Sequence, residues 1–136
     1  MNAPSIVFRG RVATGKGVAV GFTSADWARR AFKELVGIDP HPGTLNLIVS
    51  DGPDLEAWRR LRATPGLRMS NPDPNWCDGL LYPVSLPGGI KAAIVVPEVG
   101  DYDPRQVEII APVRLREALG LTDGDLVEVT AAVGAS

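Results

Sequence analysis

The sequence predicts a mainly β protein: a small closed β-barrel of about six strands, with two or three short helices. Three observations favour this fold. Short apolar runs follow one another along the chain, and hydrophobic residues make up 45% of it, which is enough for a core. The 15 glycines and 12 prolines indicate many turns. Few segments carry the spacing of an amphipathic helix.

The strands are predicted from short apolar or alternating runs that turn residues border. The first is 6–12, and a second over 18–22 follows a glycine-containing loop, which predicts a β-loop-β unit. Another strand begins at Thr44. No element is predicted over 64–78. The remaining strands are expected at 80–86, which is interrupted or edged at Pro83, and at 90–96, 107–110 and 126–129.

The helices are predicted from apolar residues that recur every three or four positions. The first helix is 25–36, and Thr23 with Asp26 forms a start that resembles a capping box, with Asp in place of Glu. A second short helix is expected at 54–62. A third is expected at 112–119, where a proline precedes the apolar positions and a glycine follows them.

Length, charge and cysteine content narrow the class of protein. The 136 residues suit one domain, so we expect residues 1–136 to form a single unit. A net charge of −2 argues against a nucleic-acid or membrane-surface binder. Cys77 has no partner for a disulfide or a zinc site, and His41 is expected in a surface turn. No signal peptide or bilayer-spanning segment is visible, so we expect a cytoplasmic protein.

Thr44 and Asn46 stand out at the start of an apolar strand. Side chains alternate between the two faces of a strand, so these two point the same way. Two small oxygen-bearing side chains on one face suit a hard cation or a phosphate. The alternative is that they complete the turn that Pro42 and Gly43 begin.

Two further segments carry groups suited to phosphate. Gly15 and Gly17 allow backbone N–H groups to approach a phosphate, with Lys16 as a nearby cation. The spacing matches neither the P-loop nor the dinucleotide-binding pattern, so a plain hairpin turn is the alternative. Arg114 and Arg116 lie near the start of the last helix, where anions bind, although solvated helix arginines are common.

Glu108 is a carboxylate inside the apolar run 107–110. In a strand it faces away from its neighbours, which fits either a solvated outward position or a polar ligand at the barrel mouth. The sequence contains no evident Ser-His-acid set and no His/Cys cluster, which disfavours nucleophilic hydrolases and zinc enzymes. The remaining groups fit a chemistry of positioning better than covalent catalysis.

Taken in order, these segments resemble the archaeal CTP-dependent riboflavin kinase family, whose fold is a cradle-loop barrel. The resemblance covers nearly the full length. Its most specific parts are Gly-Thr-Leu-Asn at 43–46 and Glu-Ile-Ile-Ala-Pro at 108–112. The closing helix-turn-strand is shared more widely among such barrels and supports the fold more than the function. The matching segments are 10–17, 35–37, 40–47, 93–97, 108–116, 119–121 and 123–125.

This family transfers the γ-phosphate of CTP to the ribityl hydroxyl of riboflavin, giving FMN and CDP. The resemblance implies that Thr44 and Asn46 bind Mg²⁺ and that Gly100 and Glu108 contact the flavin. We hypothesise that Glu108 also orients or deprotonates the attacking hydroxyl. Phosphoryl transfer depends largely on positioning and charge neutralisation, so this small set of residues suffices for it. The resemblance further implies nucleotide contacts from Lys16, Gly17, Val18, Ala19, Val20, Gly21, Val113, Arg114, Leu115 and Arg116.

The sequence departs from the family pattern in two places. The family's Gly-Glu-Gly element in the first loop is Gly17-Val18-Ala19 here, and Gly100 stands where a hydroxyl is expected beside the flavin phosphate. One alternative is therefore a non-catalytic flavin- or nucleotide-binding module on the same barrel. Another is a DNA-binding relative of the barrel, which the net acidity and the lack of a basic stripe disfavour.

Overall fold

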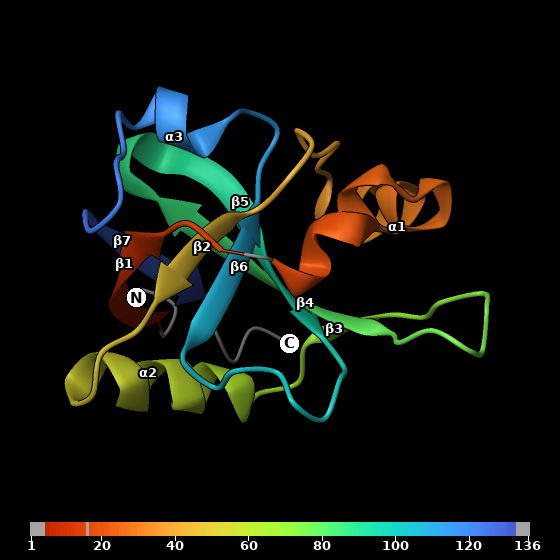
Figure 1. Cartoon of the computed structure of the whole chain (residues 1–136), viewed down its shortest axis with the longest axis horizontal. Coiled ribbons are helices and arrows are strands. Elements are labelled where there is room, and N and C mark those ends of the chain that lie inside the picture. Colours follow the sequence, from red (N-terminus) through yellow and green to blue (C-terminus); the bar gives the residue numbers. More distant parts are fainter. Residues whose placement is uncertain (1–4, 16, 133–136) are drawn as a thin grey trace.

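A closed antiparallel barrel forms the body of the molecule (Figure 1). The computed structural model describes residues 5–15 and 17–132. Six strands pair in the circular order β4-β5-β6-β2-β1-β7, and the contact of β7 with β4 closes the ring. A further strand, β3, extends the free edge of β4. The described strands are β1 (Ser5–Ala13), β2 (Leu45–Ile48), β3 (Leu67–Met69), β4 (Gly79–Leu86), β5 (Ile90–Pro97), β6 (Gln106–Ile110) and β7 (Leu126–Ala132). The predicted fold class is confirmed.

The strand alternation divides the buried side chains between two clusters. In β1, buried and exposed residues alternate strictly up to the last position, so Ile6 and Phe8 face the barrel interior. A second cluster lies on the outer side of β4, β5 and β6. It includes Val95 and Ile110, and Phe32 packs with them from the first helix. One part of the barrel wall is therefore buried on both faces.

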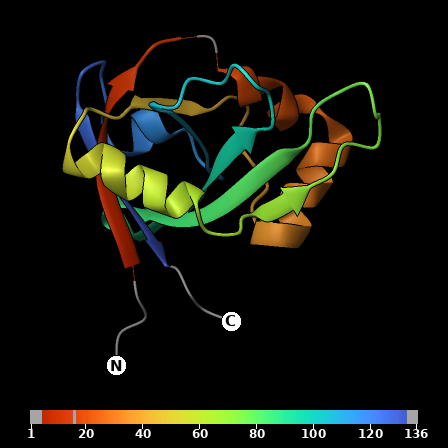
Figure 2. The ribbon, with the colours of Figure 1, turned by 90° about the horizontal axis from the view of Figure 1, so that it is seen from below.

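Three α-helices cover the barrel in the described part of the chain: α1 (Asp26–Val36), α2 (Pro53–Arg62) and α3 (Leu115–Ala118). The views place α3 and α2 at different ends of the barrel and α1 to one side (Figures 1 and 2). Trp58 of α2 packs on Phe8, with 5.5 Å between the ring centroids. The first two helices are confirmed, whereas the third is shorter than the predicted 112–119. These helices are too short or too polar to cross a membrane.

Two local predictions are wrong. The segment predicted as a strand over 18–22 is a 3-10 helix, η1 (Val18–Ser24), so the chain has no β-loop-β unit there. The capping box is also absent, because the N-cap of α1 is Ala25 and no side chain caps it. The Thr23 hydroxyl instead donates to the Val20 carbonyl at 2.7 Å and accepts the Gly43 N–H at 3.0 Å.

The polar segment 64–78 contains β3, which the sequence did not indicate. It leads through a loop into β4, and the two strands form an extended hairpin (Figure 1). Strand β4 runs through Pro83 without interruption. One edge of β4 pairs with β5. On the other edge of β4, residues 79–81 pair with β3 and Ser85 pairs with β7. Pro83 lies between these pairings, where the missing N–H of proline is tolerated.

Candidate functional site

The buried carboxylate of Glu108 is the centre of the candidate site. Its neighbours in β6, Val107 and Ile109, belong to the barrel-interior cluster, so Glu108 faces the outer side of the wall. There it pairs in register with Asn46 on one side and Val95 on the other. Glu108 is 0% exposed. The solvated outward position that the sequence left open is therefore wrong.

Three protein segments donate hydrogen bonds to this carboxylate. The Ala19 N–H of η1 bridges both oxygens, at 3.1 Å from Oε1 and 3.0 Å from Oε2. The Thr44 hydroxyl donates to Oε1 at 3.0 Å, and the Tyr102 hydroxyl donates to Oε2 at 2.7 Å. Burying a carboxylate is costly unless such donors replace water. The arrangement therefore fastens η1, the start of β2 and the 98–105 loop to one point.

Tyr102 is a site residue that the sequence reasoning missed. Burial raises the pKa of its phenol well above the usual range, and the adjacent negative charge of Glu108 raises it further. The phenol therefore stays protonated through neutral and moderately alkaline pH and remains a donor. A hydroxyl-bearing aromatic in a polar loop, six residues before a carboxylate in an apolar strand, was the available signal.

Gly17 allows η1 to approach Glu108. A Cβ atom at this position would collide with Glu108 Oε1 and would lie 2.8 Å from both Thr44 Oγ1 and Val20 Cγ2. Backbone strain is not the reason, because the φ angle of Gly17 is −67°, which any residue adopts. The glycine is required by space, next to the side chains that define the site.

Gly17→Ala is expected to destabilise the fold by about 1–3 kcal/mol, because the new methyl group displaces η1 from Glu108. Gly15→Ala is the matched control, since a Cβ atom there meets nothing within 4 Å. We expect the control to leave the stability unchanged or to raise it by less than about 1 kcal/mol. Urea unfolding of the two variants provides the measurement. Equal stability of both variants would refute the close packing at Gly17.

Thr44 and Asn46, which the sequence predicted to point the same way, both lie next to Glu108. Thr44 lies just before β2, and its proton is committed to Glu108, so the lone pairs of Oγ1 point elsewhere. Asn46 Oδ1 accepts a hydrogen bond from Gln106 Nε2 at 3.2 Å and keeps its second lone pair. The described residues contain no group of three or more His, Cys, Asp or Glu side chains that would hold a metal without a ligand's help. The donor set fits Mg²⁺ bound jointly by neutral oxygens and phosphate.

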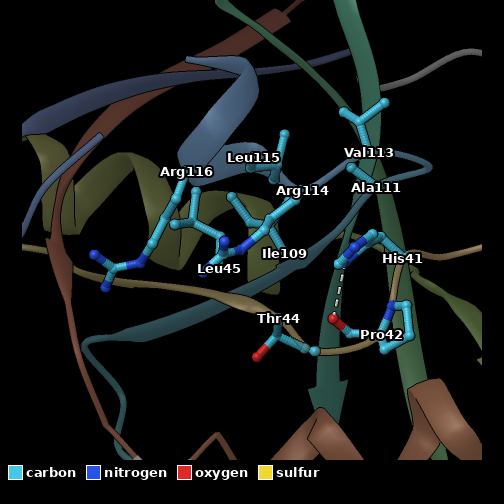
Figure 3. Close-up of a pocket in the computed structure, with 11 residues that line it drawn as sticks. His41, Pro42, Thr44, Leu45, Ile109, Ala111, Val113, Arg114, Leu115 and Arg116 are labelled. Carbon is cyan, nitrogen blue, oxygen red and sulfur yellow. Dashed lines mark hydrogen bonds between the residues drawn. The ribbon is translucent and has the colours of Figure 1, made fainter. Parts of the chain in front are cut away.

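A pocket of about 170 Å³ opens beside Thr44, between the start of β2 and α3 (Figure 3). Of the predicted site residues, it brings together Thr44 and the segment 113–116. The sequence reasoning missed His41 as a lining residue, because a histidine between two prolines resembles a surface turn. Figure 3 shows His41 and Pro42 on one side of the pocket and Arg116 on the other. The lining is completed by Gly43, Leu45, Ile109 and Ala111.

Both pocket arginines contact acidic side chains. Arg114 pairs with Glu117 at 2.7 Å, and Arg116 pairs with Asp123 at 2.8 Å. Arg116 also donates to Thr14 Oγ1 at 3.2 Å. The hydrogen bonds from Arg116 and Thr14 lower the pKa of the Asp123 carboxyl. A phosphate at Arg116 would therefore compete with Asp123.

The remaining predicted site residues that the structure describes lie outside the pocket. Lys16 is outside the described residues. The segment 17–21, which is predicted to contact the nucleotide, reaches Glu108 through the Ala19 N–H and does not line the pocket. Gly100 lies in the exposed loop between β5 and β6, two residues before Tyr102, with open space around its Cα. Three predicted segments, around Ala19, Thr44 and the 98–105 loop, therefore meet at the Glu108 carboxylate. The predicted nucleotide segment 113–116 instead lines the pocket, and Thr44 belongs to both places.

Comparisons with known proteins give a consistent family. A family model described as "Domain of unknown function DUF120", whose short name denotes CTP-dependent riboflavin kinase, matches residues 12–131. The "Riboflavin kinase" of Methanocella arvoryzae is 42% identical over 124 residues, which cover 91% of this chain and 56% of that protein. The protein of the same name from Pyrobaculum aerophilum is 39% identical over 136 residues, with coverages of 94% and 61%. The chain therefore spans somewhat more than half the length of these relatives.

Proposed function

The chain belongs to the CTP-dependent riboflavin kinase family, and from this we propose that it is a riboflavin kinase. It would transfer the γ-phosphate of CTP to the ribityl hydroxyl of riboflavin and release FMN and CDP. The observation that carries the proposal beyond family membership is the buried Glu108 carboxylate. It joins η1, Thr44 and the 98–105 loop, which are the segments that the reaction would need together.

We assign the nucleotide to the 16–21 segment and to residues 113–116. The pocket beside Thr44 supports this assignment, because residues 113–116 line it and contribute two arginines. Its volume of about 170 Å³ is below the range typical of whole small-molecule sites, so it would hold one part of the nucleotide. Arginine suits phosphate through its planar donors, and Arg116 would exchange Asp123 for this partner.

Thr44 and Asn46 are the residues that we assign to Mg²⁺. Bound with the triphosphate, the ion would neutralise charge on the transferred group. Two neutral oxygens bind it weakly on their own, so the affinity would depend on the phosphates. Glu108 would contribute by holding the Thr44 hydroxyl, because its hydrogen bond leaves the lone pairs of Oγ1 free for another partner.

We assign the orientation or deprotonation of the attacking ribityl hydroxyl to Glu108. The Ala19 N–H contacts both carboxylate oxygens, so it can stay with one while the other accepts a new donor. Tyr102 and Thr44 hold one oxygen each and fix the direction of the carboxylate. On the flavin side we place Gly100 with Glu108. Ala19, which departs from the family's Gly-Glu-Gly element, supplies its backbone N–H and needs no particular side chain.

The decisive experiment is to incubate the protein with riboflavin, Mg²⁺ and each nucleoside triphosphate in turn, and to separate the flavins by chromatography. We expect FMN to form, with CTP as the best donor, and EDTA to abolish the reaction. Failure to form FMN with any triphosphate would refute the kinase proposal. Tight riboflavin or nucleotide binding without turnover would instead support the second candidate, a non-catalytic binding module on the same barrel.

A further inference from the structure

We infer that Tyr102 is a positioning residue that couples the flavin side of the site to the nucleotide side through Glu108. The inference rests on the proposed function for the identity of the two sides. Its physical basis is one hydrogen bond of 2.7 Å from the Tyr102 hydroxyl to Glu108 Oε2. The same carboxylate receives Ala19 from η1 and Thr44 from the start of β2.

The 98–105 loop is anchored at both ends, and at its start the Glu98 N–H donates to the Asp78 carbonyl at 2.9 Å. Trp58 Nε1 donates to the Pro104 carbonyl at 3.1 Å, and the Val49 N–H donates to the Arg105 carbonyl at 2.9 Å. Glu98, at the start of the loop, pairs with Arg68 on the β3–β4 hairpin. Among the described side chains of this loop, Tyr102 is the one that reaches Glu108. A ligand that moves the middle of the loop therefore acts on the carboxylate through this phenol.

The two oxygens of the Glu108 carboxylate have different partners, so a rotation of the carboxylate would break specific hydrogen bonds. Tyr102 holds Oε2 and Thr44 holds Oε1, while the Ala19 N–H bridges the two. Without the phenol hydroxyl, Oε2 keeps only its share of the Ala19 N–H, so the carboxylate is held less firmly against rotation. Such a rotation would misdirect the Thr44 hydroxyl and loosen η1. Tyr102 thus acts on both substrate sides without belonging to the pocket.

The first test compares Tyr102→Phe with Tyr82→Phe. Both remove one hydroxyl from a tyrosine packed against the barrel core, but the Tyr82 hydroxyl donates only to the backbone carbonyls of Arg62 and Thr64, at 3.5 and 3.4 Å. We expect Tyr102→Phe to lower kcat/KM for FMN formation by about tenfold, since the lost hydrogen bond is to a charged group. Tyr82→Phe should stay within about twofold of wild type. Equal activity of the two variants would overturn the inference.

A double-mutant cycle then asks whether Tyr102 acts through Glu108. In the Glu108→Gln background we expect Tyr102→Phe to change kcat/KM by less than about threefold, because the group it positions is already altered. A merely structural contribution of Tyr102 would give the same factor in both backgrounds. Additivity of the two substitutions would therefore overturn the positioning role.

A third measurement needs no enzyme activity and separates this inference from the kinase proposal. Hydrogen exchange in the ligand-free protein should be at least about fivefold faster across Val18–Ser24 in Tyr102→Phe than in Tyr82→Phe. This result without FMN formation would keep the coupling and reject the kinase. FMN formation by wild type with unchanged exchange in Tyr102→Phe would keep the kinase and reject the coupling.

Discussion

Glu108→Gln is expected to lower kcat for FMN formation by about 100-fold or more, which is the effect of removing a general base. The amide keeps the size of the side chain and one acceptor oxygen. It removes the negative charge that draws together the Ala19 N–H and the hydroxyls of Thr44 and Tyr102. The measurement is steady-state kinetics with saturating CTP and Mg²⁺, together with circular dichroism to establish that the variant is folded.

Glu128→Gln is the matched control for this experiment. Glu128 is exposed on β7 and pairs in register with Arg9, on another part of the barrel wall. We expect its kcat to equal that of wild type. If Glu108→Gln has the same turnover as the control, Glu108 is not a catalytic group. If Glu108→Gln raises only KM for the nucleotide, the carboxylate anchors η1 and takes no part in the transfer step.

The barrel strands were predictable because their burial leaves a local pattern: β1 alternates between buried and exposed residues, whereas β5 and β6, buried on both faces, are short continuous apolar runs. The segment 18–22 was wrongly predicted as a strand because its composition is equally apolar, whereas it forms part of the 3-10 helix η1. Val18 and Val20 are 51% and 40% exposed, whereas Ala19 is 0% exposed beneath them. The backbone there is held by the hydrogen bond from the Ala19 N–H to the Glu108 carboxylate, which is distant in sequence. Local pattern cannot report a contact of this kind, and tertiary context overrides the strand propensity.

The candidate site, like the fold, was predictable from the sequence only in part. The polarity of Thr44, Asn46 and Glu108 conflicted with their apolar surroundings, and the structure places all three together. Tyr102 and His41 lie in loops, where polar and aromatic residues are common, so the signal for them was weak. The conflict between a side chain and its local pattern was the useful signal. Site residues without such a conflict could be identified only once the fold was known.

Thr44→Val is expected to lower kcat/KM by about 100-fold and to raise the Mg²⁺ concentration for half-maximal activity by about tenfold. Valine has the shape of threonine but no hydroxyl, so it removes both the proposed metal ligand and the donor to Glu108 Oε1. Asn46→Leu should raise the Mg²⁺ requirement in the same direction. The measurement is a Mg²⁺ titration at several fixed CTP concentrations.

Two further variants separate the metal role of Thr44 from its role in folding. Thr64→Val is the matched control, because the Thr64 hydroxyl bonds the Leu61 carbonyl at the end of α2 and lies outside the site. Its Mg²⁺ dependence should equal that of wild type. Thr44→Ser keeps the hydroxyl and should retain most of the activity. A Thr44→Val enzyme with a wild-type Mg²⁺ requirement would exclude Thr44 as a metal ligand, and any loss of rate would then come from the freed Glu108 carboxylate.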